Sequence, residues 1–179
     1  MKGTTLLIFV TVQRAVELVI ASRNTKALRR RGAYEVGADH YPVMVALHAS
    51  WLTTLWLQGP RRVVSLRFLC LFVTLQLGRA WVLTTLRGRW TTRIMILPGA
   101  APVMSGPYRF VRHPNYLIVA LELPCVALAL GLRRHALLFG AANLAMLAWR
   151  IRCEDRALRQ SRGPESNRGG RGASKPHWG

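Results

Sequence analysis

The sequence predicts an all-α integral membrane protein with about five transmembrane helices, and three observations support this class. Hydrophobic residues make up 51% of the chain although its formal net charge is +19, a combination that a soluble domain of 179 residues rarely shows. The apolar residues come in long blocks and not in the narrow stripe of a soluble amphipathic helix. The basic residues collect between alternate blocks, as in proteins whose basic loops face the cytosol.

Five apolar blocks account for the predicted helices. A helix needs about 20 mostly apolar residues to cross the hydrocarbon core of a bilayer. The first and third blocks meet this length, whereas the other three are short enough to be buried helices of a soluble core. Because five blocks leave too little polar chain to cover them, we favour the membrane. The blocks are residues 4–21, 42–57, 63–86, 116–132 and 135–151.

The distribution of charge predicts the orientation. If the N-terminus lies outside and all five helices cross, 18 of the 26 Lys and Arg residues lie in cytosolic segments and six lie on the opposite side. Since basic loops remain in the cytosol, we expect the segment between the third and fourth helices and the C-terminal tail to be cytosolic.

Two regions are expected, a transmembrane domain over residues 1–159 and a Gly/Arg-rich tail over residues 160–179. The tail has no apolar periodicity and is predicted to be disordered, with arginines that rest on anionic membrane lipids. Nucleic acid is not an expected partner, because the apolar blocks favour a membrane protein over a soluble basic one. The three cysteines are widely spaced without a CxxC motif, so no metal site is predicted.

Charged residues within apolar helices are costly and are therefore candidates for function. Arg14 and Glu17 are three residues apart and can pair on one helix face. Arg79 either extends to the cytosolic surface or binds an anionic ligand such as a substrate. Glu122, just before Leu-Pro in LELPC, is either a general base or the partner of Arg79. Two other polar residues are expected to form hydrogen bonds between helices: His48 and Asn143.

The segment GPYRFVRHPNY places basic residues directly before the fourth helix. Pro114 suits the first helical position, where it loses no hydrogen bond. The N–H groups of that helix end and the nearby Arg109, Arg112 and His113 then form either an anion or carboxylate site or a lipid head-group anchor. Upstream, TRIMIL is expected to be either a short strand or an interfacial stretch.

Glu154 and Asp155 follow the fifth helix in RIRCEDRALR, on the same predicted side as His113. They either neutralise the surrounding arginines or bind the cationic end of a zwitterionic cofactor.

These motifs resemble those of the isoprenylcysteine carboxyl methyltransferase family, from about Gln76 to Leu158. The longer pattern QLGRAW, TTRIMILPGA, GPYRFVRHPNY and RIRCEDRAL is similar to a bacterial branch encoded beside type III polyketide synthases, whose members methylate long-chain alkylresorcinols or alkylpyrones. The family usually has Glu-Glu where this chain has Glu154-Asp155.

The resemblance implies an integral membrane methyltransferase without a Rossmann fold that uses S-adenosylmethionine and acts in a bacterial cell membrane. It places Arg112, His113, Pro114, Asn115, Tyr116, Glu154 and Asp155 at the cofactor. A lipophilic acceptor enters from the bilayer, with Glu122 the first and His113 the second candidate for the general base that a phenol or enol hydroxyl requires.

Three alternatives to hydroxyl methylation remain open from the sequence. The first is methylation of the carboxylate of a prenylcysteine-like substrate, which needs no base. The second is an NADPH-dependent membrane reductase of the sterol type, in which Arg109 and Arg112 bind a nucleotide phosphate. The third is a small transporter or lipid-binding scaffold without enzymatic activity.

Overall fold

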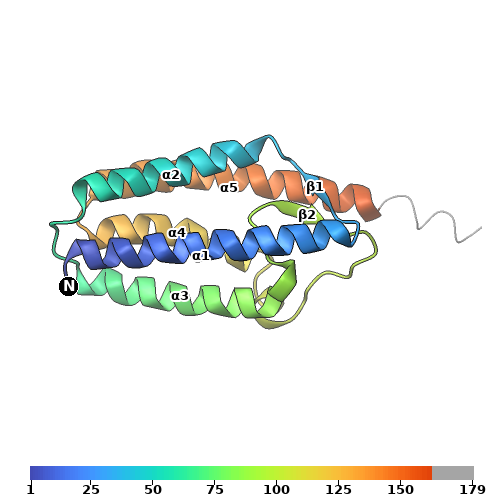
Figure 1. Cartoon of the computed structure of the whole chain (residues 1–179), viewed down its shortest axis with the longest axis horizontal. Helices are drawn as coiled ribbons and strands as arrows, with labels where there is room; N and C mark the ends of the chain where they lie inside the picture. Colours follow the sequence, from blue (N-terminus) through green and yellow to red (C-terminus); the bar gives the residue numbers. More distant parts are fainter. Residues whose placement is uncertain (163–179) are drawn as a thin grey trace, which may run out of the picture.

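Five long helices run side by side in the computed structural model, which describes residues 1–162 (Figure 1). The predicted tail lies, from residue 163 onward, outside the described residues. Each apolar block of the sequence became one helix. The helices are α1 (Gly3–Arg30), α2 (His40–Gln58), α3 (Leu66–Leu86), α4 (Pro114–Ala129) and α5 (Arg133–Arg162).

Successive helices alternate in direction, so the connections gather at the two ends of the bundle. Residue 1, the α2–α3 connection and the α4–α5 turn lie at one end, and the α1–α2 and α3–α4 connections lie at the other (Figure 1). Three helical segments are long and apolar enough to cross a membrane: Gly3–Arg30, Leu66–Arg89 and Arg133–Ala157. The shorter apolar helix α4 lies among them. The predicted all-α membrane class is confirmed.

The inner and outer faces of the bundle are both apolar, as a lipid environment requires. Inward, Leu7, Leu55 and Leu123 are fully buried, and the indole N–H of Trp51 donates to the carbonyl of Leu123 at 3.3 Å. Outward, large apolar side chains on several helices are exposed, among them Ile8, Phe9, Leu77, Leu137 and Leu138.

A two-stranded antiparallel sheet closes the end of the bundle that carries the α3–α4 connection. Strand β2 (Ile94–Ile96) falls within TRIMIL, which decides between the two expectations for that stretch, and it pairs with β1 (Tyr34–Val36). Glu35 forms ion pairs with Arg29 at 2.7 Å and with Arg93 at 2.5 Å. The Arg93 guanidinium also lies 3.8 Å from the ring centroid of Tyr41. These contacts fasten the two connections to each other.

α4 starts at Pro114, as predicted, and its neighbour α5 follows after a tight turn. Gly131 in this turn has φ +72°, a conformation that glycine adopts without strain. The short turn makes α4 and α5 antiparallel neighbours, so the beginning of α4 faces the later part of α5.

The opposite end of the bundle depends on a close backbone approach, which gives a first prediction. A Cβ atom at Gly3 would lie 2.1 Å from the carbonyl oxygen of Gly59. Gly3→Ala is therefore expected to lower the free energy of unfolding by about 1–3 kcal/mol, as overpacking does. Thermal unfolding in detergent would measure this, with Gly88→Ala as control because a Cβ there meets nothing within 4 Å. Equal melting temperatures for the two variants would contradict the close approach.

Candidate functional site

Four charged residues from three helices, three of them buried and Arg14 partly buried, form one ion-pair network in the middle of the bundle. Glu122 of α4, whose side chain is fully buried, pairs with Arg79 of α3 and lies 2.9 Å from Arg14 of α1. Arg14 also pairs with Glu17 at 2.9 Å, and Glu17 lies 3.3 Å from the Nε of Arg79. Two guanidinium groups thus balance two carboxylates, which is the condition for charges to be tolerated away from water.

Two amide side chains complete the network. Gln76 donates to Glu122 at 3.0 Å and accepts a hydrogen bond from Gln13 at 2.6 Å. Gln13 also donates to Glu17 at 2.9 Å. The sequence predicted the Arg14–Glu17 pair as a local feature, whereas in the structure it is continuous with Arg79 and Glu122.

The sequence predicted that Glu122 is either a general base or the partner of Arg79. In the structure it is the partner of Arg79. Its carboxylate oxygens are taken by Arg14, Arg79 and Gln76, and its side chain does not line the cavity described next. A general base must reach the proton that it abstracts. Arg79 is likewise buried and does not extend to the surface, although it lines the cavity.

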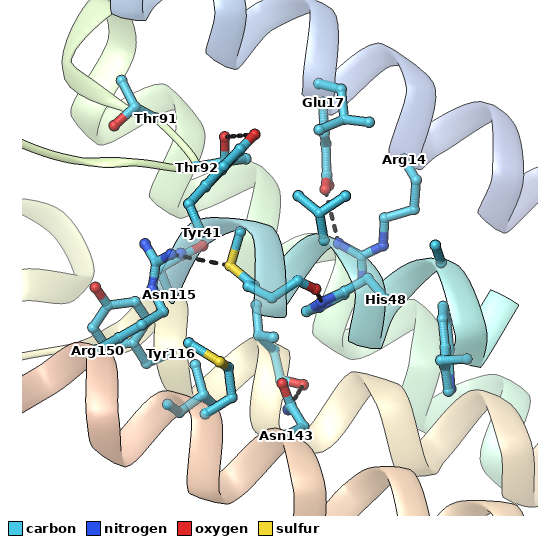
Figure 2. A pocket seen from close by; sticks show the side chains of 18 of the residues that line it. Arg14, Glu17, Tyr41, His48, Thr91, Thr92, Asn115, Tyr116, Asn143 and Arg150 are labelled. Carbon is cyan, nitrogen blue, oxygen red and sulfur yellow. Dashed lines mark hydrogen bonds and ion pairs between the residues drawn. The ribbon is translucent and has the colours of Figure 1, made fainter. Parts of the chain in front are cut away.

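A cavity of about 320 Å³ lies beside this network, with walls from all five helices and from the segment that leads into β2. Most of its lining surface comes from apolar atoms, among them those of Leu18, Val45, Leu52 and Leu147. Figure 2 shows its labelled polar side chains, which extend from Arg14 and Glu17 at the network to Tyr116 and Arg150 towards the sheet end. The polar lining residues are Arg14, Glu17, Tyr41, His48, Arg79, Thr91, Thr92, Asn115, Tyr116, Asn143 and Arg150.

The structure brings four of the predicted cofactor residues together at the sheet end of this cavity. The Tyr116 hydroxyl donates to the Glu154 carboxylate at 2.8 Å. The rings of His113 and Tyr116 are stacked, with centroids 5.3 Å apart. His113 lies 3.9 Å from Glu154 and 4.0 Å from Asp155. Residues nearly 40 positions apart thus form one acidic and aromatic cluster, which we call the mouth cluster.

The remaining predicted cofactor residues lie around the mouth cluster in different environments. Pro114 is buried at the first position of α4, and Asn115 lines the cavity, where its side-chain oxygen lies 3.5 Å from the indole nitrogen of Trp90. Arg112 is exposed, as is Arg109. They can therefore reach a solvent-borne anion but are not held in the cavity.

Tyr108 shows the electrostatic character of this region. Burial, with the nearby Glu154 carboxylate adding to it, raises the pKa of the Tyr108 hydroxyl to about 12. The phenol therefore stays neutral at physiological pH. The neutral Tyr108 phenol thus lies close to the Glu154 carboxylate of the mouth cluster, a setting that favours a cationic group.

Sequence reasoning missed several residues that line the cavity. Arg150 is buried at the end of the fifth apolar block, where it lies near the Tyr116 ring and donates to the Met44 sulfur at 3.0 Å. Its position four residues before Glu154, and hence on one helix face, was a usable signal. Tyr41 enters from the first turn of α2 and Trp90 from the α3–α4 connection, and nothing in their local sequence indicates that they line one cavity.

The family model for the isoprenylcysteine carboxyl methyltransferase (ICMT) family matches residues 68–160, more than half of the chain. The chain belongs to the ICMT family. This match confirms the family that the sequence motifs resembled. Membership of the family implies that the protein is a membrane methyltransferase. The matched segment holds α3 from Phe68 onward, α4 and α5 up to residue 160, and with them the mouth cluster.

Relatives extend the likeness over most of the chain. An uncharacterized protein of Bacillus subtilis, YpbQ, is 32% identical over 168 residues, which cover 87% of this chain and 95% of the relative. An uncharacterized protein of Haemophilus influenzae is 28% identical over 156 residues, or 81% of this chain and 88% of the relative. No solved structure matches. Helices α1 and α2, which supply Arg14, Glu17 and His48, lie before the segment that the ICMT model matches.

The network gives a second prediction. Arg79→Leu leaves Glu122 buried with an excess negative charge, and we expect it to lower the free energy of unfolding by about 3–5 kcal/mol. The double variant Arg79→Leu/Glu122→Leu keeps the Arg14–Glu17 pair balanced and should recover much of this loss. Unfolding in detergent would measure both, with Arg67→Leu on the exposed part of α3 as control. A double variant less stable than Arg79→Leu would contradict the network.

Proposed function

We propose that this ICMT-family protein transfers a methyl group from S-adenosylmethionine to a lipophilic acceptor. The observation that carries the proposal is the position of the mouth cluster, at the end of a mostly apolar cavity inside a membrane-spanning bundle. A water-soluble cofactor and an apolar acceptor need such an arrangement, because one arrives from the aqueous side and the other from the bilayer.

The residues present fit the cofactor. Its methionine part is zwitterionic and its sulfonium is cationic, and Glu154 and Asp155 offer carboxylates to an amine or to ribose hydroxyls. The stacked His113 and Tyr116 rings offer aromatic faces, which attract cations. The Nε2 atom of His113 is buried without a hydrogen-bond partner among residues 1–162, so it can bind a further polar group. Exposed Arg112 can meet the cofactor carboxylate.

The contribution of the chain to the reaction is mainly alignment. When bound, S-adenosylmethionine supplies an electrophilic methyl group on sulfur. Tyr116 belongs both to the mouth cluster and to the cavity lining, so it marks where the two substrates meet. Glu154 fixes the Tyr116 ring through its hydroxyl, and the apolar walls exclude water and orient the acceptor. Holding two reactants in line contributes much of the acceleration in such displacements.

For the acceptor we propose the hydroxyl of a long-chain alkylresorcinol or alkylpyrone, in keeping with the resemblance of GPYRFVRHPNY and RIRCEDRAL to the polyketide-associated branch. The protein would lie in a bacterial cell membrane with its N-terminus outside and the mouth cluster cytosolic, following the distribution of basic residues. The oligomeric state is open in this proposal.

The carboxylate of a prenylcysteine-like molecule is the second candidate acceptor. It is consistent with the ICMT family, and one contact favours it. Arg150 lines the cavity near Tyr116 and makes no ion pair within the described part of the chain, so its guanidinium can bind a carboxylate.

A third prediction tests the cofactor. S-adenosylhomocysteine should raise the melting temperature of the purified protein, and NADPH should not. Glu154→Gln and Tyr116→Phe should each weaken binding about tenfold, because the first replaces the charged acceptor of the Tyr116–Glu154 hydrogen bond by a neutral amide and the second removes its donor. Arg30→Gln, an exposed change at the end of α1, is the control. Stabilisation by NADPH instead would favour a reductase, and stabilisation by neither would overturn methyl transfer.

A fourth prediction tests the acceptor. Membranes that contain the protein should transfer the label of methyl-labelled S-adenosylmethionine to alkylresorcinols or alkylpyrones more readily than to prenylcysteines. If prenylcysteine is the acceptor instead, it should be the preferred substrate, and Arg150→Gln should raise its KM. Labelling of no lipid from the panel would contradict both acceptor classes.

A further inference from the structure

Two hydrogen-bond acceptors on residues that line the cavity have no role in the mechanism described above. They are the side-chain oxygen of Asn143 on α5 and the Nε2 atom of His48 on α2 (Figure 2). Both residues were expected only to join helices. Asn143 does so through its amide nitrogen, whereas the Nδ1 of His48 makes a hydrogen bond within α2. The second polar atom of each residue, Oδ1 of Asn143 and Nε2 of His48, is left for a ligand in the cavity.

The orientation of the Asn143 amide follows from its neighbour. Its Nδ2 lies 3.2 Å from the backbone carbonyl of Val119, and a carbonyl can only accept a hydrogen bond. The nitrogen must therefore point to α4, which leaves Oδ1 on the other side. The Asn143 side chain is fully buried, and Oδ1 has no partner among the described residues. Buried polar atoms normally have a partner, so this oxygen indicates a missing donor.

The same logic fixes the tautomer of His48. Its Nδ1 lies 2.9 Å from the carbonyl oxygen of Met44, one turn earlier in α2. Since that oxygen only accepts, Nδ1 carries the proton of the neutral ring and Nε2 is a lone-pair acceptor. The hydrogen bond that His48 makes within the described chain uses Nδ1, so Nε2 is left for a ligand.

Free cations are scarce at this depth of the cavity. Arg14 and Arg79, the guanidinium groups at the network end, are already paired with Glu17 and Glu122. An anionic head group placed beside Asn143 would meet an oxygen that repels it. A neutral head group with two hydroxyls instead carries one donor for each of these acceptors.

From these contacts we infer that His48 and Asn143 bind a neutral, two-hydroxyl ring of the acceptor, with His48 as its general base. The inference rests on the proposed function and narrows its substrate class to dihydroxyaromatic rings, in preference to pyrones with one hydroxyl and to carboxylates. One hydroxyl donates to Asn143 Oδ1 and orients the ring. The other hydroxyl donates to His48 Nε2 and is the one that reacts.

The proton and electron balance is complete. The reacting O–H bond breaks and its proton passes to His48 Nε2, while the oxygen electron pair forms a bond to the methyl carbon. The methyl–sulfur bond of the sulfonium donor breaks and its electron pair stays on sulfur, which becomes a neutral thioether. The imidazolium then returns its proton to water.

The variant His48→Asn separates catalysis from structure. The asparagine amide nitrogen occupies about the position of Nδ1 and can still donate to the Met44 carbonyl, but no acceptor remains at the position of Nε2. We expect kcat for a 5-alkylresorcinol to fall about 100-fold or more, as for loss of a general base. The affinity for S-adenosylhomocysteine should be unchanged.

The variant Asn143→Leu tests ring recognition, with Met146→Leu, a change of similar volume in the same cavity lining, as control. Binding is followed without cofactor by tryptophan fluorescence, because Trp51 and Trp90 both line the cavity. The parent protein and Met146→Leu should bind a 5-alkylresorcinol about tenfold more tightly than its mono-O-methyl ether, the loss expected for one hydrogen bond. Asn143→Leu should bind the two equally.

The outcomes distinguish the inference from the proposed function. If the parent protein methylates lipids but His48→Asn keeps its kcat, or Asn143→Leu keeps the preference for two hydroxyls, the inference is wrong and methyl transfer stands. If the parent protein methylates prenylcysteine carboxylates in preference to dihydroxy rings, the substrate class is wrong. If S-adenosylhomocysteine does not bind the parent protein, the proposed function itself fails.

Discussion

The pairing of Glu122 with Arg79 and Arg14 is the interaction on which the rest of the structure depends. A single charge in the centre of such a bundle would be prohibitively costly, and only full compensation makes it tolerable. Because the partners come from α1, α3 and α4, the compensation fixes the relative height of three helices. The apolar contacts around it are less directional and would allow neighbouring registers.

The register of α4 then determines the position of the mouth cluster. α4 begins at Pro114, two turns before Glu122, so anchoring Glu122 also places His113 and Tyr116. The tight turn at Gly131 makes α5 return along α4, which brings Glu154 to Tyr116. A buried ion pair and a short turn therefore suffice to join two sequence motifs nearly 40 residues apart.

The sequence predicted the helices well because their signal is local: each apolar block is one helix, and Pro114 marks the start of α4. The pair Arg14–Glu17 was also visible, since three residues along a helix define one face. The union of that pair with Arg79 and Glu122 was not visible, because it depends on how α1 packs against α3 and α4. The β1–β2 pairing was missed for the same reason, since Tyr34–Val36 is too short to show a period of two.

The distribution of charge along the cavity separates two kinds of recognition. Towards the sheet end, the carboxylates of Glu154 and Asp155 and the guanidinium of Arg150 can meet the charged groups of a water-soluble molecule. Towards the network end, the arginines are neutralised by carboxylates. The groups that can still bind a ligand there are the neutral hydrogen-bond acceptors of His48 and Asn143. Charged groups are therefore best bound where water can reach them, and a neutral polar ring is best bound deeper. This gradient follows the cost of desolvating each group, which is large for an ion and moderate for a hydroxyl that finds a partner.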